Sequence, residues 1–396
     1  MTELVQTITA RDRTRPAWAR AVAAAVGPVG SVLLCVSIAA AVLAALPTAG
    51  ESHYSFAQSL AIIGRTTWER VMLPRAPRMT EGYRNWILTL QSATPLLLTG
   101  LAVAVAFRAN VLNIGGQGQY VAGAIATTAV AVYLPGPAGL LIPMHLLAAV
   151  LAGALVAAIA AVLQRWRDVP VVLSTLLLNF VALEFLRYLL QGPMRARRDD
   201  GSLMDPQSPE LAAAARLPEF LGAGPSQGIH LGFFLAVASA ILLSLLLRWT
   251  TFGFRLKVVG QNERAARFAG MNVGRVSFAT LALSGAFAGL AGGIQVAGLA
   301  PYVLLPDLGT DGMGFTGIAV ALLGRLSPVG VVFSALFFGM LNTAFRALER
   351  SPLEIHSVAA QAVQGALVIA VLVVTSPRWA RMMRRVGPDS KLSAGL

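Results

Sequence analysis

Charge is scarce in this sequence. Only 12% of its 396 residues are charged, whereas 56% are hydrophobic and the mean hydropathy is +0.69. Soluble domains carry about a quarter charged residues, so a soluble catalytic domain is excluded. The few charges lie in short clusters separated by long apolar runs. This pattern predicts several membrane-spanning helices.

Lysine and cysteine are almost absent. Only Lys257 and Lys391 among the 31 basic residues are lysine, and Cys35 is the single cysteine. One cysteine excludes an intramolecular disulfide and a cysteine-rich metal site. The net charge of +13 does not predict nucleic-acid binding. The arginines stand mostly at the ends of apolar runs, where they suit anionic lipid headgroups.

Motifs for catalysis are also lacking. Neither lysine follows a glycine, so the chain has no P-loop with which to bind ATP. It contains no H-E-x-x-H motif, and its four histidines are widely separated, so no metal site is predicted. A single G-x-S-x-G around Ser226 lies in a Pro/Gly-rich loop without the strand and helix of a nucleophile elbow, and we interpret it as a chance match. We expect a chain that is not an enzyme and binds no cofactor itself.

The apolar runs predict an all-α, polytopic membrane bundle of about ten transmembrane helices. Most runs reach the ~20 residues that a bilayer core requires. The run 312–323 is short, and we expect it either to be extended by its neighbours or to be a half-span lining a cavity. The first run could be a cleaved signal peptide, although its length favours a retained span. The predicted spans are 29–46, 86–107, 115–134, 138–163, 171–190, 230–247, 277–299, 312–323, 329–347 and 357–375.

Ten spans place both termini on one side, and the basic residues favour the cytoplasm. The segments assigned to that side hold 19 of the 31 Arg and Lys residues but only 5 of the 18 Asp and Glu residues. The predicted organisation is a cytoplasmic segment 1–20, a transmembrane domain 21–377 and a cytoplasmic tail 378–396. Within the domain we expect a cytoplasmic loop 249–275 and external loops 49–85 and 193–228. The first external loop includes a surface helix at 56–63.

Few charges lie inside the predicted spans. Glu184 and Arg187 can form an i,i+3 ion pair, for which a structural role as a buried pair and a transport role both remain open. Neutral amides and hydroxyls are more numerous, and together they favour a polar path for an uncharged, hydroxyl-rich solute over interhelical hydrogen bonding alone. The residues expected to line this path are Asn113, Gln117, Gln119, Asn179 and Gln295. A separate small-residue line predicts close helix packing at Gly285, Gly289 and Gly293.

The cytoplasmic loop contains a pattern for a short helix. Asn262 can cap its N-terminus, Glu263 suits the first turn, and Gly270 can end it. Small, mildly apolar residues such as Ala266 form one face, and the loop has no core of its own to cover that face. The local pattern leaves open whether the helix enters a groove of a cytoplasmic partner or lies on the headgroups.

Three motifs resemble one protein family. The sequence G-Q-N-E-R-A-A-R-F-A-G-M at 260–271 resembles the coupling loop of ATP-binding-cassette (ABC) importer permeases that handle simple sugars, nucleosides and branched-chain amino acids. The segment 107–119 resembles the Asn-Ile-Gly…Glu-Gly-Gln segment of the nucleoside and simple-sugar permeases, and 314–330 is similar to their later span and turn. The resemblance covers residues 85–376. Gln117 departs from the pattern, because many relatives carry Glu there.

The resemblance implies a multi-pass permease subunit of an ATP-driven importer in the bacterial inner membrane, with a nucleoside or related simple sugar as its solute. Separate ABC ATPase subunits would bind ATP, a second identical or different permease would complete the pathway, and a substrate-binding lipoprotein or periplasmic protein would deliver the solute. The residues implied in ATPase contact are Gly260, Asn262, Glu263, Ala266 and Gly270. The alternatives are a permease for branched-chain amino acids, a stand-alone secondary carrier and a membrane scaffold.

Overall fold

The computed structural model describes residues 61, 79–220, 228–299 and 301–349. The chain divides into two compact units, Ala76–Thr343 and a second unit made of Met1–Arg75 with Ala344–Leu396. Almost all of the second unit lies outside the described residues, so the account below concerns the first. The predicted spans 29–46 and 357–375, the motif around Ser226 and all but one residue of the segment 56–63 also lie outside the described residues.

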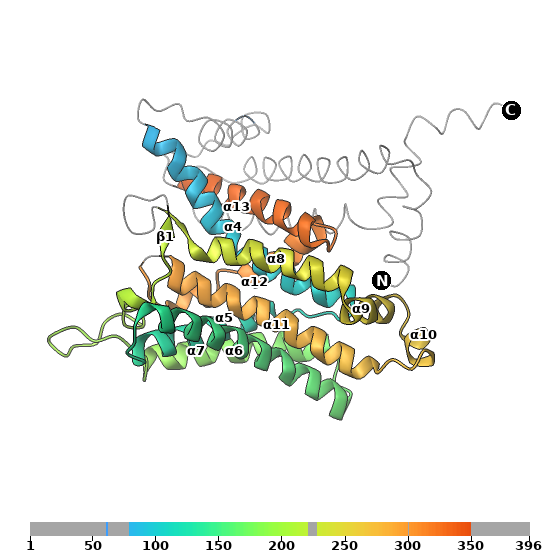
Figure 1. Cartoon of the computed structure of the whole chain (residues 1–396). Coiled ribbons are helices and arrows are strands. Elements are labelled where there is room, and N and C mark those ends of the chain that lie inside the picture. The colour runs from blue at the N-terminus through green and yellow to red at the C-terminus, as the bar shows by residue number, and fades with distance from the viewer. Residues whose placement is uncertain (1–60, 62–78, 221–227, 300, 350–396) are drawn as a thin grey trace, which may run out of the picture. The chain divides into compact units, whose positions relative to one another are not determined.

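The first unit is built mainly from helices (Figure 1). The elements are α4 (Met79–Arg108), α5 (Gly116–Tyr133), α6 (Ala138–Arg167), α7 (Val171–Gln191), η2 (Ala213–Ala215), β1 (Glu219–Phe220), β2 (Ile229–His230), α8 (Leu231–Trp249), α9 (Thr251–Gln261), α10 (Glu263–Phe268), α11 (Val273–Gly298), η3 (Pro306–Gly309), α12 (Met313–Leu323) and α13 (Pro328–Glu349).

Eight of the predicted spans correspond to helices, namely α4 to α8 and α11 to α13. Among the described residues, α6, α7, α8, α11 and the Arg84–Arg108 part of α4 are long and apolar enough to cross a membrane. α12 has only 11 residues, so its neighbours do not extend it to a full span. At the ~1.5 Å rise per residue of a helix, it covers about half of a bilayer core ~30 Å thick.

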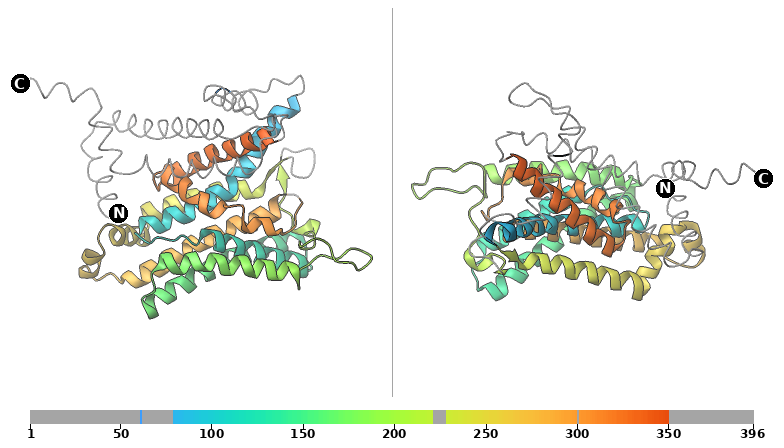
Figure 2. Two further views of the ribbon diagram at one scale, coloured as in Figure 1. Left: turned by 180° about the vertical axis from the view of Figure 1, so that it is seen from behind. Right: turned by 90° about the horizontal axis from the view of Figure 1, so that it is seen from above.

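Helices α4 and α11 form the inside of this unit. α11 packs along α5, α6 and α4, and α12 packs along α4. The long helices run roughly side by side in all three views (Figures 1 and 2). One end of the unit carries α9 and α10, and the opposite end carries residues 192–220 and 228–230 with the two-stranded pair β1–β2 (Figure 1).

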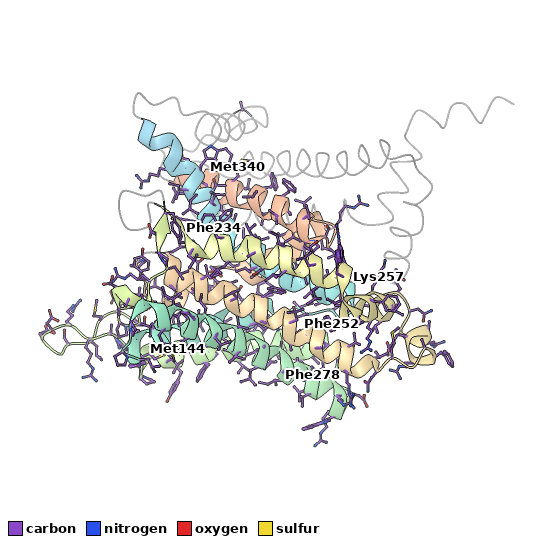
Figure 3. All side chains as sticks on the ribbon, viewed as in Figure 1. Met144, Phe234, Phe252, Lys257, Phe278 and Met340 are labelled. Carbon is purple, nitrogen blue, oxygen red and sulfur yellow. The ribbon has the colours of Figure 1, made fainter. Side chains whose placement is uncertain are left out.

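Apolar side chains cover much of the outside of the unit (Figure 3). Met144 of α6, Phe234 of α8 and Phe278 of α11 are all exposed, and Leu155 is 64% exposed. In a soluble protein so much exposed apolar surface would favour association. In a bilayer, the same side chains face lipid tails.

The ion pair predicted within α7 is present but does not lie in the interior. The Arg187 guanidinium is 2.6 Å from the Glu184 carboxylate at i,i+3 spacing. Both side chains are more than half exposed, so the expectation of a buried pair is wrong for this unit. The helical register turns this part of α7 away from α5, whereas Asn179 and Leu186 on the opposite face are buried.

Candidate functional site

The chain leaves helical geometry between α4 and α5. Asn110 adopts a left-handed conformation with φ of 58°, and the Val111 amide donates back to the Ala106 carbonyl at 3.1 Å. The Asn113 side chain then accepts a hydrogen bond from the Gly115 amide at 2.9 Å. The segment 109–115 therefore turns back beside the last turns of α4 before α5 begins. Non-helical backbone is tolerated at membrane depth where protein surrounds it.

Two buried amides hold this returning segment in place. Asn113 and Gln119 exchange two side-chain hydrogen bonds of 3.0 and 3.1 Å. Asn113 Nδ2 also donates to Ser284 Oγ at 2.9 Å, and Ser284 Oγ donates to the Ala102 carbonyl at 2.6 Å. These contacts tie the start of α5 to both α4 and α11.

Asn179 attaches α7 to the start of α5 and the segment that precedes it. Its Oδ1 accepts from the Gly118 amide at 2.8 Å, and its Nδ2 donates to the Ile114 carbonyl at 3.0 Å. The Ile114 amide donates to Thr175 Oγ1 at 3.3 Å. The side chain of Asn179 thus bonds backbone groups that the break before α5 leaves without helical partners.

Gln117 connects α5 to the chain that precedes α12. Its Nε2 lies 3.2 Å from the Leu308 carbonyl, 3.1 Å from the Gly309 carbonyl and 3.0 Å from Asp311 Oδ1. Its Oε1 accepts from the Gly314 amide at 2.7 Å. One buried amide side chain therefore bonds both η3 and the first turn of α12.

Asp311 completes this contact. Its Oδ1 accepts from the Met313 amide at 3.1 Å, and its Oδ2 accepts from the Tyr120 hydroxyl at 3.0 Å. Tyr120 and Gln117 are fully buried, whereas Asp311 is partly exposed. A carboxylate at the N-terminus of a helix is favoured by the helix dipole.

The N-termini of α5 and α12 meet in the middle of the bundle. Thr99 Oγ1 donates to the Met313 carbonyl at 3.2 Å, and Thr99 lies nine residues before the end of α4. At the helical rise of 1.5 Å per residue, this contact is about 14 Å from that end. α12 is therefore a half-length helix whose first turn lies well inside the bundle, as the half-span alternative for 312–323 expects.

Four of the five residues expected along a polar path converge here. Asn113, Gln117, Gln119 and Asn179 are each at most 2% exposed and bond to one another or to nearby backbone. Gln295 takes no part in this network, and its buried Oε1 has no hydrogen-bond partner within the described structure.

Sequence reasoning missed Asp311, Tyr120 and Ser284. Asp311 lies just before the predicted span 312–323, and an acidic residue two positions before a short apolar helix is a recognisable capping signal. Tyr120 and Ser284 lie within apolar runs, and nothing in their sequence surroundings distinguishes them from ordinary core residues.

The glycine line of α11 lies against two neighbouring helices. A Cβ at Gly285 would collide with the Gly153 carbonyl of α6, and one at Gly289 would collide with the Ala149 carbonyl. A Cβ at Gly293 would lie 2.5 Å from Thr127 Oγ1 of α5. The three helices approach so closely here that their backbones touch.

The loop between α8 and α11 contains two helices, α9 and α10. Asn262 Oδ1 accepts from the Ala265 amide at 3.0 Å and so caps α10. The Glu263 carboxylate is 2.6 Å from the Arg267 guanidinium. Gly270 follows the helix with φ of 77°, a conformation that L-residues rarely adopt. The loop therefore presents a short, well-defined helix at the end of the unit.

The residues expected to contact an ATPase fall into two groups. Asn262, Glu263 and Gly270 are exposed, as is the neighbouring Phe268, which is 93% exposed. Gly260 and Ala266 are buried. A Cβ at Gly260 would collide with the Arg108 carbonyl oxygen, so Gly260 brings α9 against the end of α4.

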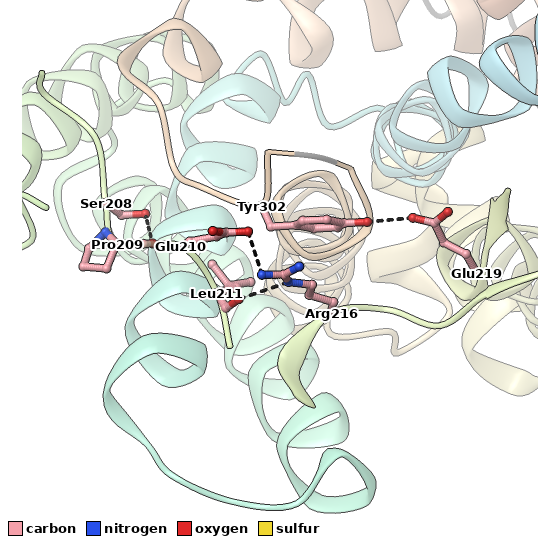
Figure 4. Close-up of polar contacts among 7 residues, drawn as sticks. All are labelled: Ser208, Pro209, Glu210, Leu211, Arg216, Glu219 and Tyr302. Atoms are coloured by element: carbon pink, nitrogen blue, oxygen red, sulfur yellow. Dashed lines mark hydrogen bonds and ion pairs between the residues drawn. The ribbon is translucent and has the colours of Figure 1, made fainter. Parts of the chain in front are cut away.

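The segment at the opposite end folds back onto the bundle (Figure 4). The Arg216 guanidinium lies 4.6 Å from the centroid of the Tyr302 ring and 2.6 Å from the Glu210 carboxylate. The Tyr302 hydroxyl donates to Glu219 Oε1 at 2.7 Å. The Leu211 amide donates to the Tyr302 carbonyl at 3.0 Å. This segment is therefore a folded cap over the end of α11.

Within the described residues 192–220, a narrow hairpin extends away from the cap. Arg197 pairs with Leu203 across it, and Gly201 takes φ of 80° at its tip. The hydrogen bonds from Ser202 lower the pKa of the exposed Asp200 carboxyl. Across the described residues, no group of three His, Cys, Asp or Glu side chains could hold a metal ion.

Comparison with known proteins identifies relatives of this chain. Residues 85–372 match the family described as the branched-chain amino acid transport system / permease component. A glucose ABC transporter permease of Haloferax volcanii is 40% identical over 259 residues, which are 64% of this chain and 67% of that protein.

Two further relatives are named for nucleosides. A guanosine ABC transporter permease of Bacillus subtilis is 34% identical over 303 residues, covering 74% of this chain and 85% of that protein. A nucleoside ABC transporter permease of Lactococcus lactis is 31% identical over 261 residues, covering 64% of this chain and 70% of that protein. The chain, a multi-pass membrane protein, belongs to the permease family described as the branched-chain amino acid transport system / permease component.

Proposed function

We propose that this chain is the permease subunit of an ATP-driven ABC importer for nucleosides or a related simple sugar. The observation that carries the solute class is the similarity to the guanosine permease, which extends over 85% of that protein. The 40% identity to a glucose permease favours a simple sugar as the second candidate. A nucleoside contains the sugar ribose, so both readings describe a hydroxyl-rich solute.

The chain would cross the bacterial inner membrane ten times, with both termini in the cytoplasm. The α10 end of the unit would face the cytoplasm. The arginines at this end support that orientation, since Arg255, Arg264, Arg267 and Arg275 lie within or beside α9 and α10. The cap formed by residues 192–220 and 228–230 would then face outward, where a substrate-binding lipoprotein or periplasmic protein would deliver the solute.

The ATPase subunit would contact α10 and the turns that flank it. Asn262, Glu263, Gly270 and Phe268 are exposed there and could enter a groove, because a 93% exposed phenylalanine next to a capped helix suits helix-in-groove recognition. Gly260 and Ala266 would support this surface from beneath. ATP would be bound by that partner, since this chain has no P-loop. A second permease, identical or different, would complete the pathway.

Reconstitution tests this function. The complex retained by a tagged copy of the chain is incorporated into liposomes, and uptake of radiolabelled guanosine is measured with and without ATP. We expect uptake that requires ATP and the whole complex, and competition by other nucleosides but not by leucine. Competition by glucose in place of nucleosides would favour the sugar reading. Ion-driven uptake by the chain alone would contradict the proposal.

A further inference from the structure

α12 is joined by polar contacts to the centre of the bundle at its first turn. Gln117 Oε1 accepts from the Gly314 amide at 2.7 Å, and Gln117 Nε2 lies 3.0 Å from Asp311 Oδ1. Asp311 in turn accepts from the Met313 amide. The two bonds of Gln117 connect α5 with the chain around the start of α12. The bond from the Met313 amide holds the Asp311 carboxylate in position for this contact.

The other end of α12 is joined to the end of α4. The chain turns sharply after α12, with Arg325 and Leu326 at φ of 53° and 56°. Within this turn, the Leu326 carbonyl accepts a hydrogen bond of 2.7 Å from Arg108 Nε. Arg108 is the last residue of α4, so its side chain links α4 to the turn between α12 and α13.

Arg108 also lies directly against the loop that carries α10. The Gly260 backbone touches the Arg108 carbonyl so closely that a single methyl group would not fit between them. Gly260 belongs to the last turn of α9, and Asn262 begins α10 two residues later. With no side chain between these backbones to absorb a displacement, a movement of α9 must also displace Arg108.

Between its two ends, α12 lies on α4 through small residues. A Cβ at Gly317 would lie 2.7 Å from Thr99 Oγ1, and one at Gly100 would lie 2.8 Å from the Val320 side chain. Thr99 also donates to the Met313 carbonyl at 3.2 Å, and helices packed through such small residues can slide past one another by small amounts. The start of α5, by contrast, is bonded to α4, α7 and α11 through Asn113, Gln119 and Asn179.

We propose that α12 is the element that moves during transport, that Arg108 transmits to it the displacement of the α9–α10 loop, and that the Gln117–Asp311 contact is the latch at its other end. This inference rests on the proposed ATP-driven transport and names its positioning residues. Opening the latch separates the N-terminus of the half-length α12 from that of α5 inside the bundle, which is where a passage for a polar solute is needed.

An exchange of the two latch residues provides the sharpest test. Gln117→Glu alone places two carboxylates within hydrogen-bond distance, and Asp311→Asn alone removes the carboxylate. The double variant Gln117→Glu with Asp311→Asn restores one amide and one carboxylate in exchanged positions. We expect each single variant to lower the maximal rate of ATP-driven uptake by about tenfold or more, as loss of a buried polar partner does. The double variant is expected to recover only part of the rate, because a carboxylate at position 117 cannot donate to the Leu308 and Gly309 carbonyls.

Controls separate a latch from a merely structural role. Glu184→Gln, on the exposed face of α7, should transport at the wild-type rate. The KM for the solute should change less than the maximal rate, and each variant should retain its ATPase partner on purification. At the other end of α12, Arg108→Gln should lower uptake while ATP hydrolysis continues, and Arg108→Lys should recover part of it.

The outcomes distinguish the inference from the function on which it rests. If the wild-type complex takes up no solute with ATP, the proposed function is wrong. If the wild-type complex transports and the exchanged double variant is no better than the single variants, the latch is wrong. Wild-type uptake rates in both single variants would also overturn the latch. An undiminished uptake rate in Arg108→Gln would show that Arg108 does not transmit the displacement to α12.

Discussion

At the scale of single residues, glycine decides how closely α11 approaches its neighbours. Gly289 faces the Ala149 carbonyl and lies beside Gly153, so the backbones of α11 and α6 meet without side chains between them. In a lipid environment such close contact supplies much of the attraction between helices, because the lipid tails are as apolar as the helix surfaces.

We therefore expect Gly289→Val to destabilise the protein. The new side chain cannot be placed without moving α6 away from α11, and overpacking of this kind costs about 1–3 kcal/mol or more. The midpoint of thermal unfolding in detergent should fall. Gly139→Ala is the matched control, because a Cβ there meets nothing within 4 Å and alanine is the better helix former. An unchanged midpoint in Gly289→Val would contradict the packing described here.

The polar residues show what sequence can and cannot reveal at this scale. Their types and their places within apolar runs predicted that amides would gather inside the bundle, and Asn113, Gln117, Gln119 and Asn179 do so. Their pairing was not predictable, because Asn113 meets Ser284 across 171 positions of the chain. Asp311 escaped notice because only the folded chain shows that residues 306–312 reach the first turn of α5.

At the scale of elements, α10 is defined by its two ends. Asn262 caps its start, the Glu263–Arg267 pair spans its length, and Gly270 allows the left-handed turn that follows. A helix of only six residues is not stable on its own, so these contacts and the tertiary packing of Ala266 maintain its shape.

We expect Glu263→Arg combined with Gly270→Pro to uncouple transport from ATP hydrolysis. Proline cannot adopt the positive φ of Gly270, and arginine opposes the dipole at the first turn. Membrane insertion should be retained, while co-purification of the ATPase falls and ATP-driven uptake drops. Asp199→Arg with Gly201→Pro makes similar changes in the exposed hairpin at the opposite end, and it should leave ATPase binding intact. Normal uptake in the first variant would show that α10 is not the coupling surface.

Hydropathy predicted most helix positions well, because a long apolar run has few alternatives in a bilayer. The predicted spans 138–163 and 171–190 begin at the same residues as α6 and α7. The interruption between α4 and α5 was also predicted, because it falls between the spans 86–107 and 115–134. The bonds from Asn113 and Asn179 that shape it were not predictable. α9 was not anticipated as a separate helix, because residues 251–261 mix charged and apolar side chains without a clear period.

At the scale of the whole molecule, the main prediction is the orientation in the membrane: the α10 end faces the cytoplasm and the hairpin at the opposite end faces outward. The single cysteine, Cys35, makes the test straightforward, because Cys35→Ala gives a background without thiols. In that background, Phe268→Cys should react with a membrane-impermeant maleimide only from the cytoplasmic side. Asp199→Cys in the exposed hairpin should react only from outside. Labelling of Phe268→Cys in intact cells with a sealed membrane would reverse the orientation and exclude coupling to a cytoplasmic motor.

The contact between Gln117 and Asp311 has a consequence for how the protein is made. The two residues are 194 positions apart. At synthesis rates of about 5–20 residues per second, a ribosome delivers Asp311 roughly 10–40 seconds after Gln117. During that interval α5 has been synthesised, but the Gln117 side chain at its start lacks its partners Asp311 and Gly314. The insertion machinery must therefore accommodate the unpaired polar side chain of Gln117 until residues 306–314 have been synthesised.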